Sequence, residues 1–338
     1  MALRIGSLEL DSRLLFAPIA GGSTPAYRRI ARRYGAGLVV SELVSARGIV
    51  RQGIGRNYRY LAMAPDEHPV ALQLFGSEPA DFAGAIRILL DDPGMAQFDA
   101  IDLNLGCPVP KVVRSGAGAA LLLDPPRAEA IARAAAGALA GTGKPLTAKL
   151  RIGFEAGGEQ GLEVARRLAD GGVQALTVHG RTREQYYSGT ADRAAIGRIV
   201  SALAKSHPHV VMIANGDVDS AASAADMYRQ TGAPALMIGR AALGRPWIFR
   251  DFTETVALDE RIAVMREHAE GTVRLLGEEQ GCRELRAELQ PYLRGFTGAS
   301  RLRRQTTTLT TLSDVEALLA ALAATEQPDQ QPETVPRR

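Results

Sequence analysis

The chain reads PLTAKLRIG at 145–153, EQGLEVARRLADGG at 159–172 and ALTVHG at 175–180. The two apolar runs are continuous rather than strictly alternating, which is typical of strands buried on both faces of a parallel sheet. The segment between them has helical spacing and ends at glycines, a common helix stop. This strand–helix–strand unit predicts a parallel sheet with helices packed on its faces.

The same alternation continues on both sides of this unit. Helical segments separate the runs; PAYRRIARRYG (25–35) opens with proline, and SEPADFAGAIRILLDDPG (77–94) carries Ser77 as the expected N-cap. Eight strands, each followed by a helix or a long connection, predict a (β/α)8 TIM barrel. A doubly wound open sheet is the alternative, disfavoured because eight strands close a barrel without an extra edge strand. The six further runs are LLFAPIA (14–20), LVVSELV (38–44), VALQLFG (70–76), AIDLNLG (100–106), VVMIANG (210–216) and ALMIGRA (235–241).

The pattern changes after Arg250. Residues 259–325 contain no strand-like run and show helical spacing throughout. The tail EQPDQQPETVPRR (326–338) is polar, contains three prolines and is predicted to be disordered. We therefore expect a catalytic TIM barrel over 1–250, a smaller C-terminal helical domain over 251–325 and a disordered tail.

Composition limits the possible classes of protein. Of 338 residues, 40 are Lys or Arg and 37 are Asp or Glu, which excludes a polycation but not a local basic surface. Two cysteines, Cys107 and Cys282, suit a reducing compartment, and no zinc-ligand spacing is present. The N-terminus lacks the apolar run of a signal peptide, and no run approaches the roughly 18 residues of a membrane span. We expect a cytoplasmic protein that uses neither a membrane nor a metal.

Polar side chains stand inside or just after the apolar runs, although a buried unpaired polar group costs about 1–3 kcal/mol. The Gln73 amide both donates and accepts, as the edge of a flat heterocycle requires, or else it is a satisfied core residue. Lys149 is one of only four lysines, and when buried it needs an anionic partner, either a carboxylate such as Glu42 or a reduced, negatively charged ring. His179, followed by GRTR, indicates an anion or RNA contact.

Glycine-rich segments close the last two barrel strands. NGDV (215–218) and IGRAALGRPW (238–247) free backbone N–H groups for a phosphate, which the loops after strands seven and eight of barrels often bind. Arg240 adds a charge-assisted donor. Tight turns alone are the alternative explanation for these glycines.

The loop NLGCPVPKVVRSGAGAALL (104–122) is the most informative for chemistry. A thiol with the ordinary pKa of roughly 8.5 is mostly protonated at neutral pH, so Cys107 could donate a proton or act as a nucleophile. Lys111 lies four residues away and would favour a thiolate, so the residues alone leave both roles open. The glycine-rich SGAGAA (115–120) predicts a mobile loop that closes over substrate.

Basic residues gather in two regions. Lys111, Arg114, Arg181 and Arg183 lie on two loops at the expected catalytic face. Residues 283–304 carry a net charge of +4, which suits contacts to nucleic-acid phosphates, although a solvated helix face is the alternative. The arginines of this second region are Arg283, Arg286, Arg294, Arg301, Arg303 and Arg304.

These motifs together resemble the tRNA-dihydrouridine synthases, most closely the bacterial B-type branch, over about residues 4–300. The chain departs from the family pattern after LFAPIAG, where Pro25 follows Thr24 and the usual aspartate is absent. The C-terminal part matches weakly, mainly through YLRGFTGASRLR (292–303). The matching motifs are LFAPIAG, QLFG, the cysteine loop, TAKLRIG, TVHGRTREQYYSG, IANGDV and ALMIGRAALGRPWIF.

The resemblance implies an enzyme that binds FMN, is reduced by NADPH and reduces the C5–C6 bond of uridines in the D loop of tRNA. Cys107 would protonate C5 while the flavin gives hydride to C6, on a base turned out of the stack. Asn104 would position the uracil, and Lys111, Arg114, Arg151, Arg181, Arg183, Arg294 and Arg301 would contact substrate or tRNA. The FMN site would comprise Pro18, Ile19, Ala20, Gln73, Lys149, His179, Asn215, Gly216, Asp217, Gly239 and Arg240.

Two other functions fit parts of the pattern. Another FMN barrel that reduces a free small molecule explains the flavin positions but not the arginines or the helical appendage. A non-catalytic tRNA-binding protein explains the arginines, but it has no need of a thiol beside Lys149 and Gln73. We expect a monomer in any case.

Overall fold

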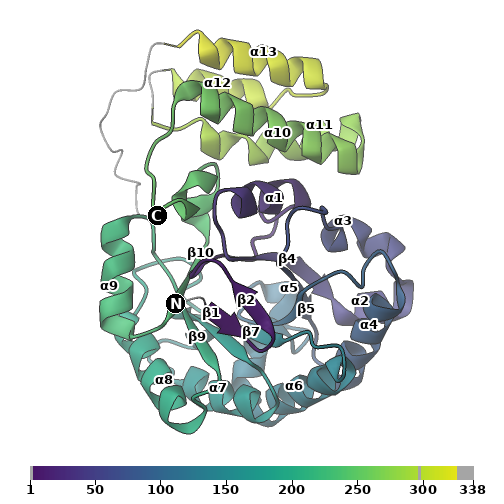
Figure 1. The fold of residues 1–338 in the computed structure, drawn as a ribbon, viewed down its shortest axis with the longest axis vertical. Helices are drawn as coiled ribbons and strands as arrows, with labels where there is room; N and C mark the ends of the chain where they lie inside the picture. Colours follow the sequence, from purple (N-terminus) through teal and green to yellow (C-terminus); the bar gives the residue numbers. More distant parts are fainter. Residues whose placement is uncertain (1–2, 296–297, 326–338) are drawn as a thin grey trace.

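Eight parallel strands close into a barrel in a computed structural model that describes residues 3–295 and 298–325 (Figure 1). The predicted TIM barrel is therefore confirmed, and the open sheet is excluded because β10 pairs with both β9 and β3. The barrel strands are β3 (Leu14–Phe16), β4 (Leu38–Ser45), β5 (Val70–Phe75), β6 (Ala100–Leu105), β7 (Leu146–Gly153), β8 (Ala175–Thr182), β9 (Val211–Asn215) and β10 (Ala235–Ile238).

Helices surround the barrel, as the alternating pattern predicts. The main ring consists of α1 (Pro25–Arg33), α4 (Pro79–Asp91), α6 (Pro125–Leu139), α7 (Gln160–Asp170), α8 (Arg193–Ser206) and α9 (Ala221–Thr231). Shorter helices lie at the carboxyl ends of the strands: α2 (Ala46–Gln52), α3 (Tyr58–Leu61) and α5 (Pro110–Val113), with the 3-10 turns η1 (Gly55–Asn57), η2 (Gly118–Leu123), η3 (Arg240–Ala242) and η4 (Pro246–Phe249).

A two-stranded hairpin, β1 (Leu3–Ile5) and β2 (Leu8–Leu10), covers one end of the barrel, and the sequence analysis did not predict it. Its Leu3, Ile5 and Leu10 are buried against small strand residues such as Ala100 and Ala175. Because this hairpin covers the amino-terminal ends of the strands, the opposite end is left for polar chemistry.

Two local expectations are corrected. Glu78 rather than Ser77 occupies the N-cap of α4, and its side chain makes no capping bond; Pro79, which has no N–H, starts the helix. The segment SGAGAA is not a free loop, since its second half belongs to η2. Ala119 is buried there, and its N–H donates to the Cys107 carbonyl at 3.1 Å.

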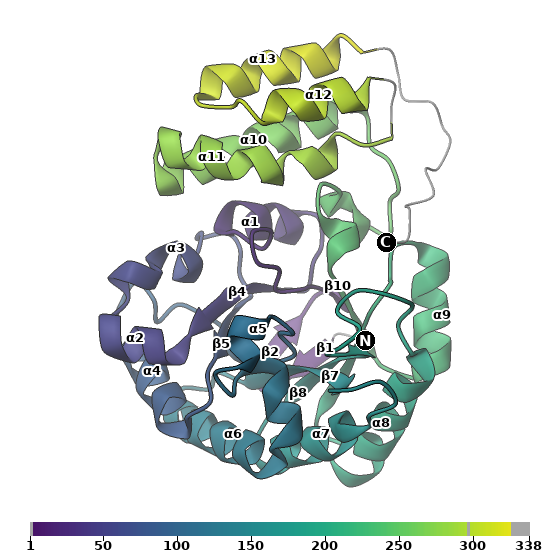
Figure 2. The same ribbon diagram turned by 180° about the vertical axis from the view of Figure 1, so that it is seen from behind.

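The C-terminal helices form a separate layer above the barrel (Figures 1 and 2). They contact it mainly through α1, where the rings of Tyr27, Trp247, His268 and Tyr292 pack with centroids 5.2–6.5 Å apart. Cys282 is buried on α11. The predicted disordered tail, 326–338, lies outside the described residues. The helices are α10 (Leu258–Leu276), α11 (Glu278–Glu288), α12 (Ala299–Thr306) and α13 (Leu312–Ala323), with the turn η5 (Gln290–Tyr292).

Among the residues that the structure describes, no helix combines the length and the apolar character needed to cross a membrane. The same residues contain no group of three or more His, Cys, Asp or Glu side chains arranged to hold a metal ion.

Candidate active site

The strand register brings the predicted polar residues together at the carboxyl end of the barrel. β6 and β7 pair Asn104 with Lys149, and β7 and β8 pair Arg151 with His179. The next pairing, between β8 and β9, sets His179 beside Asn215. Separate motifs, far apart in the sequence, therefore meet at one edge of the sheet, where barrel enzymes place their active sites.

Cys107 lies just beyond this edge on the turn that follows β6. Its thiol is half-buried, and its backbone N–H donates to Asn104 Oδ1 at 2.9 Å. Burial raises the pKa of the Cys107 thiol, with smaller opposing effects from the Val109 backbone and Arg151. The thiol is therefore protonated at neutral pH, which favours a proton donor over a thiolate nucleophile. Lys111 does not act on it, being exposed on α5.

Lys149 is half-buried on β7, and no described carboxylate lies in ion-pair contact with it. Desolvation lowers its pKa to about 7, with Arg151 lowering it further and Asp102 opposing. Within the described part of the chain Lys149 forms no ion pair, and the alternative partner Glu42 accepts a hydrogen bond from the Gly21 backbone instead. An ammonium in such surroundings is poised to bind an anionic ligand.

The electrostatic surroundings of His179 show the same excess of positive charge. Burial lowers the pKa of His179 well below its ordinary value, and four cations lower it further. The imidazole is therefore neutral at physiological pH and can accept or donate one hydrogen bond to a ligand. The four cations are Lys149, Arg151, Arg181 and Arg240.

Arg181 is buried rather than presented on the surface, with 2% of the residue exposed. Its guanidinium binds Asp217 in a bidentate ion pair, with N–O distances of 2.8 and 2.9 Å. The Ser188 and Gly189 carbonyls accept its remaining strong hydrogen bonds. The predicted tRNA contact by Arg181 gains no support from this geometry, which instead shows Arg181 fixing the loop that carries Asp217.

Arg151 joins two loops of the site. Its Nε donates to the Gly106 carbonyl at 2.7 Å, and its Nη1 donates to the carbonyls of Thr182 and Tyr186 at 2.8 and 2.9 Å. The guanidinium also lies over the Tyr187 ring. Arg151 therefore holds the cysteine turn against the loop after β8, whether or not it also contacts substrate.

The glycine-rich loops pack closely against neighbouring loops at the carboxyl end of the barrel. Gly216 has φ +133°, and a Cβ there would lie 2.6 Å from the Ala191 Cβ, so only glycine fits. A Cβ on Gly239 would lie 3.9 Å from Ile19 Cδ1, which places the loop after β10 beside the loop after β3. Pro18 and Ile19 are half-buried and Ala20 is exposed there. Asn215 is buried, and its amide donates to the Met237 carbonyl at 2.8 Å.

Only some of the arginines in the predicted basic stripe of the helical part are available to contact RNA. Arg283 pairs with Glu279, Arg286 donates to the Leu309 carbonyl and Arg303 donates to the Leu293 carbonyl. These three stabilise the helical layer, so the idea of one continuous RNA-binding stripe is corrected. Exposed basic residues remain at Lys111, Arg114, Arg294, Arg301 and Arg304, while Arg183 is half-buried and stacks on Phe154 and Tyr186.

Sequence reasoning missed a basic surface on α2 and η1. Arg47, Arg51 and Arg56 are exposed there, and Tyr58 beside them is 49% exposed. Because β4 runs directly into α2, this surface lies at the same end of the barrel as Cys107 (Figure 2). A signal was present, since residues 46–63 contain four arginines and no acidic residue.

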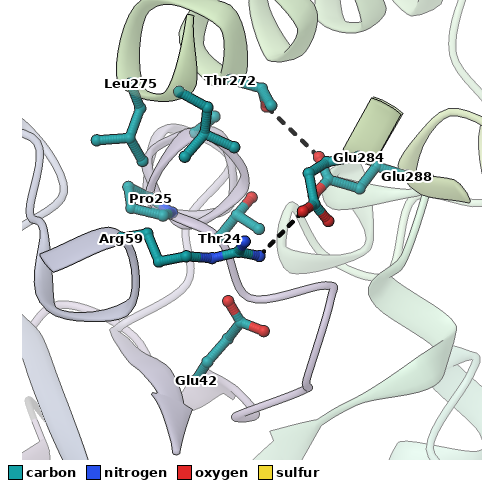
Figure 3. A pocket seen from close by; sticks show the side chains of 10 residues that line it. Thr24, Pro25, Glu42, Arg59, Thr272, Leu275, Glu284 and Glu288 are labelled. Carbon is teal, nitrogen blue, oxygen red and sulfur yellow. Dashed lines mark hydrogen bonds and ion pairs between the residues drawn. The ribbon is translucent and has the colours of Figure 1, made fainter. Parts of the chain in front are cut away.

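A small pocket lies beside the site, between α1, α10 and α11 (Figure 3). Arg59 extends from α3 between Glu42 and Glu284, and it donates to Glu284 at 3.1 Å. Thr272 donates to Glu288 on the opposite wall. These contacts join the barrel to the helical layer next to the carboxyl ends of the strands.

A comparison with protein families decides the family of the chain. The family model described as "Dihydrouridine synthase (Dus)" matches residues 15–327. The chain belongs to the dihydrouridine synthase family. The resemblance drawn from the cysteine loop and the neighbouring motifs is thus confirmed.

Curated members of the dihydrouridine synthase family match nearly the full chain. "tRNA-dihydrouridine synthase B" of Xanthomonas axonopodis pv. citri is 36% identical, over 86% of each chain. The protein of the same name from Pseudomonas aeruginosa is 36% identical over 95% of this chain and 94% of its own. "Probable tRNA-dihydrouridine synthase" of Mycobacterium tuberculosis is 36% identical over 96% of this chain and 85% of its own.

Solved structures support the fold of this family member. A 2-naphthoyl-CoA reductase complex aligns with TM-score 0.57 at 11% identity, covering 74% of this chain and 51% of that one. Histamine dehydrogenase from Rhizobium sp. 4-9 aligns with TM-score 0.56 at 14% identity, covering 80% and 50%. The chain thus spans about half the length of these solved chains.

Proposed function

We propose that this dihydrouridine synthase family member reduces the C5–C6 double bond of uridines in the D loop of tRNA, using FMN and NADPH, with Cys107 as the proton donor. The observation that carries the proposal is the protonated, half-buried thiol of Cys107 at the same barrel edge as an unpaired Lys149. A non-catalytic RNA-binding protein would need neither group.

The residues at the barrel edge fit FMN. Of the four cations around His179, Arg181 and Arg240 pair with Asp217. Among the described residues Lys149 and Arg151 form no ion pair, which supports a ligand with a phosphate and a ring that becomes anionic on reduction. In this proposal Lys149 and Gln73 contact the ring beside Pro18, Ile19 and Ala20. The ribityl phosphate would lie against His179, Asn215, Gly216, Asp217, Gly239 and Arg240. When bound, FMN supplies the hydride for the reduction.

The chain's own groups supply orientation and the proton. Asn104 holds the Cys107 turn through its bond to the Cys107 N–H, and we propose that it also helps to position the uracil. The Cys107 thiol delivers its proton to C5 of the base, and burial keeps this proton on sulfur until then. Arg151 fixes the turn from the other side through the Gly106 carbonyl.

The exposed basic residues give the tRNA a surface on both parts of the chain. We assign phosphate contacts to Lys111, Arg114 and Arg183 near the cysteine turn, and to Arg294 and Arg301 in the helical domain, taken as 251–325. The arginines of α2 and η1 extend this surface along the catalytic face of the barrel domain, taken as 1–250. Such contacts position the substrate without reading its sequence.

The test is direct. Purified protein is incubated with NADPH and tRNA that lacks dihydrouridine, and the tRNA is digested and analysed by mass spectrometry. We expect the gain of two hydrogens on a D-loop uridine. Unchanged tRNA, together with rapid oxidation of NADPH by a free pyrimidine or an enoate, would instead establish a small-molecule reductase. Unchanged tRNA without bound flavin would establish an RNA-binding protein.

A further inference from the structure

Asp102 is a buried carboxylate that the proposed function does not use. It lies on β6, level with Gln73 on β5 and Thr147 on β7, and only 2% of the residue is exposed. A buried carboxylate is unfavourable unless its oxygens accept hydrogen bonds. Both Asp102 oxygens do so, Oδ1 from Thr147 Oγ1 at 2.5 Å and Oδ2 from Gln73 Nε2 at 2.7 Å.

The bond to Asp102 determines how the Gln73 amide points. Burial raises the pKa of the Asp102 carboxyl, and the hydrogen bonds from Thr147 and Gln73 together with the charge of Lys149 act in the opposite direction and favour the ionised form. The ionised carboxylate only accepts hydrogen bonds, so it faces the NH₂ end of the amide. The carbonyl end, Gln73 Oε1, then faces β6 and accepts from Asn104 Nδ2 at 2.8 Å. Because the Asn104 amide is now fixed in turn, its Oδ1 is left to accept from the backbone N–H groups of Cys107 and Gly106, at 2.9 and 3.2 Å.

We propose that Asp102 is a positioning residue for the Cys107 turn. It orients the Gln73 amide, which in turn orients the Asn104 amide. Asn104 then holds the turn so that the Cys107 thiol faces the active site. The tRNA half of this inference rests on the proposed function, whereas the effect on the thiol does not.

Asp102→Asn places an amide where the carboxylate stood. The polarity of the relay is then no longer fixed, because an asparagine can present either its carbonyl oxygen or its NH₂ group. If it presents NH₂, the Gln73 amide must turn so that Oε1 rather than Nε2 faces it. The Asn104 oxygen can then turn away from the Cys107 N–H. We expect a more mobile turn and a thiol that iodoacetamide alkylates at least threefold faster at fixed pH; Cys282 is buried, and peptide mapping assigns the label.

Half-reactions separate positioning from general damage. NADPH reduces the bound flavin without Cys107, whereas reoxidation by tRNA needs its proton. In Asp102→Asn we expect reoxidation by tRNA to slow at least tenfold and reduction by NADPH to stay within twofold of wild type. A merely structural role would slow both half-reactions together or deplete bound flavin.

A matched control and a rescue variant sharpen the test. Thr147→Val removes the other hydrogen bond of Asp102 but leaves the relay, so its alkylation rate should remain within twofold of wild type. In Asp102→Asn/Gln73→Glu the two groups are exchanged: the carboxylate introduced at position 73 accepts from both asparagine amides, so Asn104 Oδ1 again faces Cys107. We expect this double variant to alkylate at the wild-type rate.

The outcomes are decisive in each case. Wild-type alkylation in Asp102→Asn, faster alkylation in Thr147→Val, or no recovery in the double variant overturns the relay. If Asp102→Asn does not fold, the double variant alone tests the relay. Alkylation at the wild-type rate then supports the relay, and faster alkylation overturns it. If wild-type protein leaves tRNA unchanged, the proposed function fails while the alkylation measurements still judge the relay.

Discussion

The protonation of a single residue, Lys149, is expected to control how tightly the site binds an anionic ligand. Its pKa is lowered to about 7 in the ligand-free protein, so the ammonium loses its proton as the pH rises from neutral. We therefore expect reduced FMN, added anaerobically so that its ring is anionic, to bind with uptake of a proton. Its affinity should fall between about pH 7 and 9, by at most tenfold per pH unit.

Titration of flavin-free protein with reduced FMN at several pH values measures this effect. The Lys149→Met variant is the control, since it should bind FMN weakly and with little pH dependence over the same range. A wild-type affinity that stays constant from about pH 7 to 9 would show that Lys149 does not contact the anionic ligand.

Cys107 gives a second prediction at the residue scale. Burial raises the pKa of its thiol, so the proton needed for catalysis is present at neutral pH and lost only at alkaline pH. The rate of the tRNA-dependent step should stay level through neutral pH and decline above the ordinary thiol value of about 8.5. A decline centred below about pH 8 in single-turnover measurements would contradict a proton-donating thiol.

Individual polar residues could be singled out from the sequence, but their partners could not. Gln73, Lys149 and His179 stood out because they interrupt apolar runs. That Gln73 bonds to Asp102, and that Arg181 is buried against Asp217, depends on strand register and loop paths, which no local pattern specifies. A charged residue at the end of an apolar run gives the same sequence pattern whether its side chain binds substrate or pairs with another side chain.

Helix α2 shows how a short element can carry a binding surface. Arg47 and Arg51 lie one turn apart and are both exposed at the catalytic end of the barrel. Arg47→Gln/Arg51→Gln should weaken tRNA binding by about tenfold and lower the slope of log K against log salt by about 2. The expected fold and flavin content are unchanged.

Fluorescence anisotropy with labelled tRNA at several salt concentrations measures both quantities. The control is Arg87→Gln/Arg166→Gln, which removes two exposed arginines from within α4 and α7 on the outer ring. Equal losses of affinity in the two double variants would show that α2 contributes only net charge and no contact.

Elements were predictable in proportion to their length and burial. All eight barrel strands appear where continuous apolar runs predict them, because burial on both faces leaves a strong signal. The hairpin β1–β2 was missed because its three-residue strands are too short to show a period. The N-cap of α4 was misplaced by one residue, within the usual uncertainty of helix ends.

The molecule as a whole depends on the aromatic junction between α1, η4 and the C-terminal helices. Tyr292 is 1% exposed and packs against Tyr27, Trp247 and His268. Tyr292→Ala should lower the free energy of unfolding by about 3–5 kcal/mol, as is typical for truncation of a large buried aromatic side chain.

Urea denaturation followed by circular dichroism measures this change. Tyr58→Ala is the matched control, because Tyr58 is 49% exposed and its truncation should change the free energy of unfolding by no more than about 0.5 kcal/mol. Comparable values for the two variants would show that the junction contributes little to the stability of the chain.

The division into a barrel followed by helices was visible in the sequence, but the packing between them was not. Loss of the strand pattern after Arg250 marked the change. The contact of Tyr27 near the N-terminus with Tyr292 near the C-terminus joins residues that no local pattern relates. The arginines of residues 283–304 were misjudged for the same reason, since Arg286 and Arg303 bond to neighbouring elements, while Arg283 pairs with Glu279 on its own helix.

The central claim is that Cys107 donates the proton that completes reduction of a tRNA uridine. Its most direct test is anaerobic single turnover, in which NADPH-reduced Cys107→Ala protein is mixed with unmodified tRNA. We predict that flavin reoxidation slows by at least about 100-fold, with flavin content and the rate of reduction by NADPH unchanged. Reoxidation by tRNA within about twofold of the wild-type rate would contradict the account.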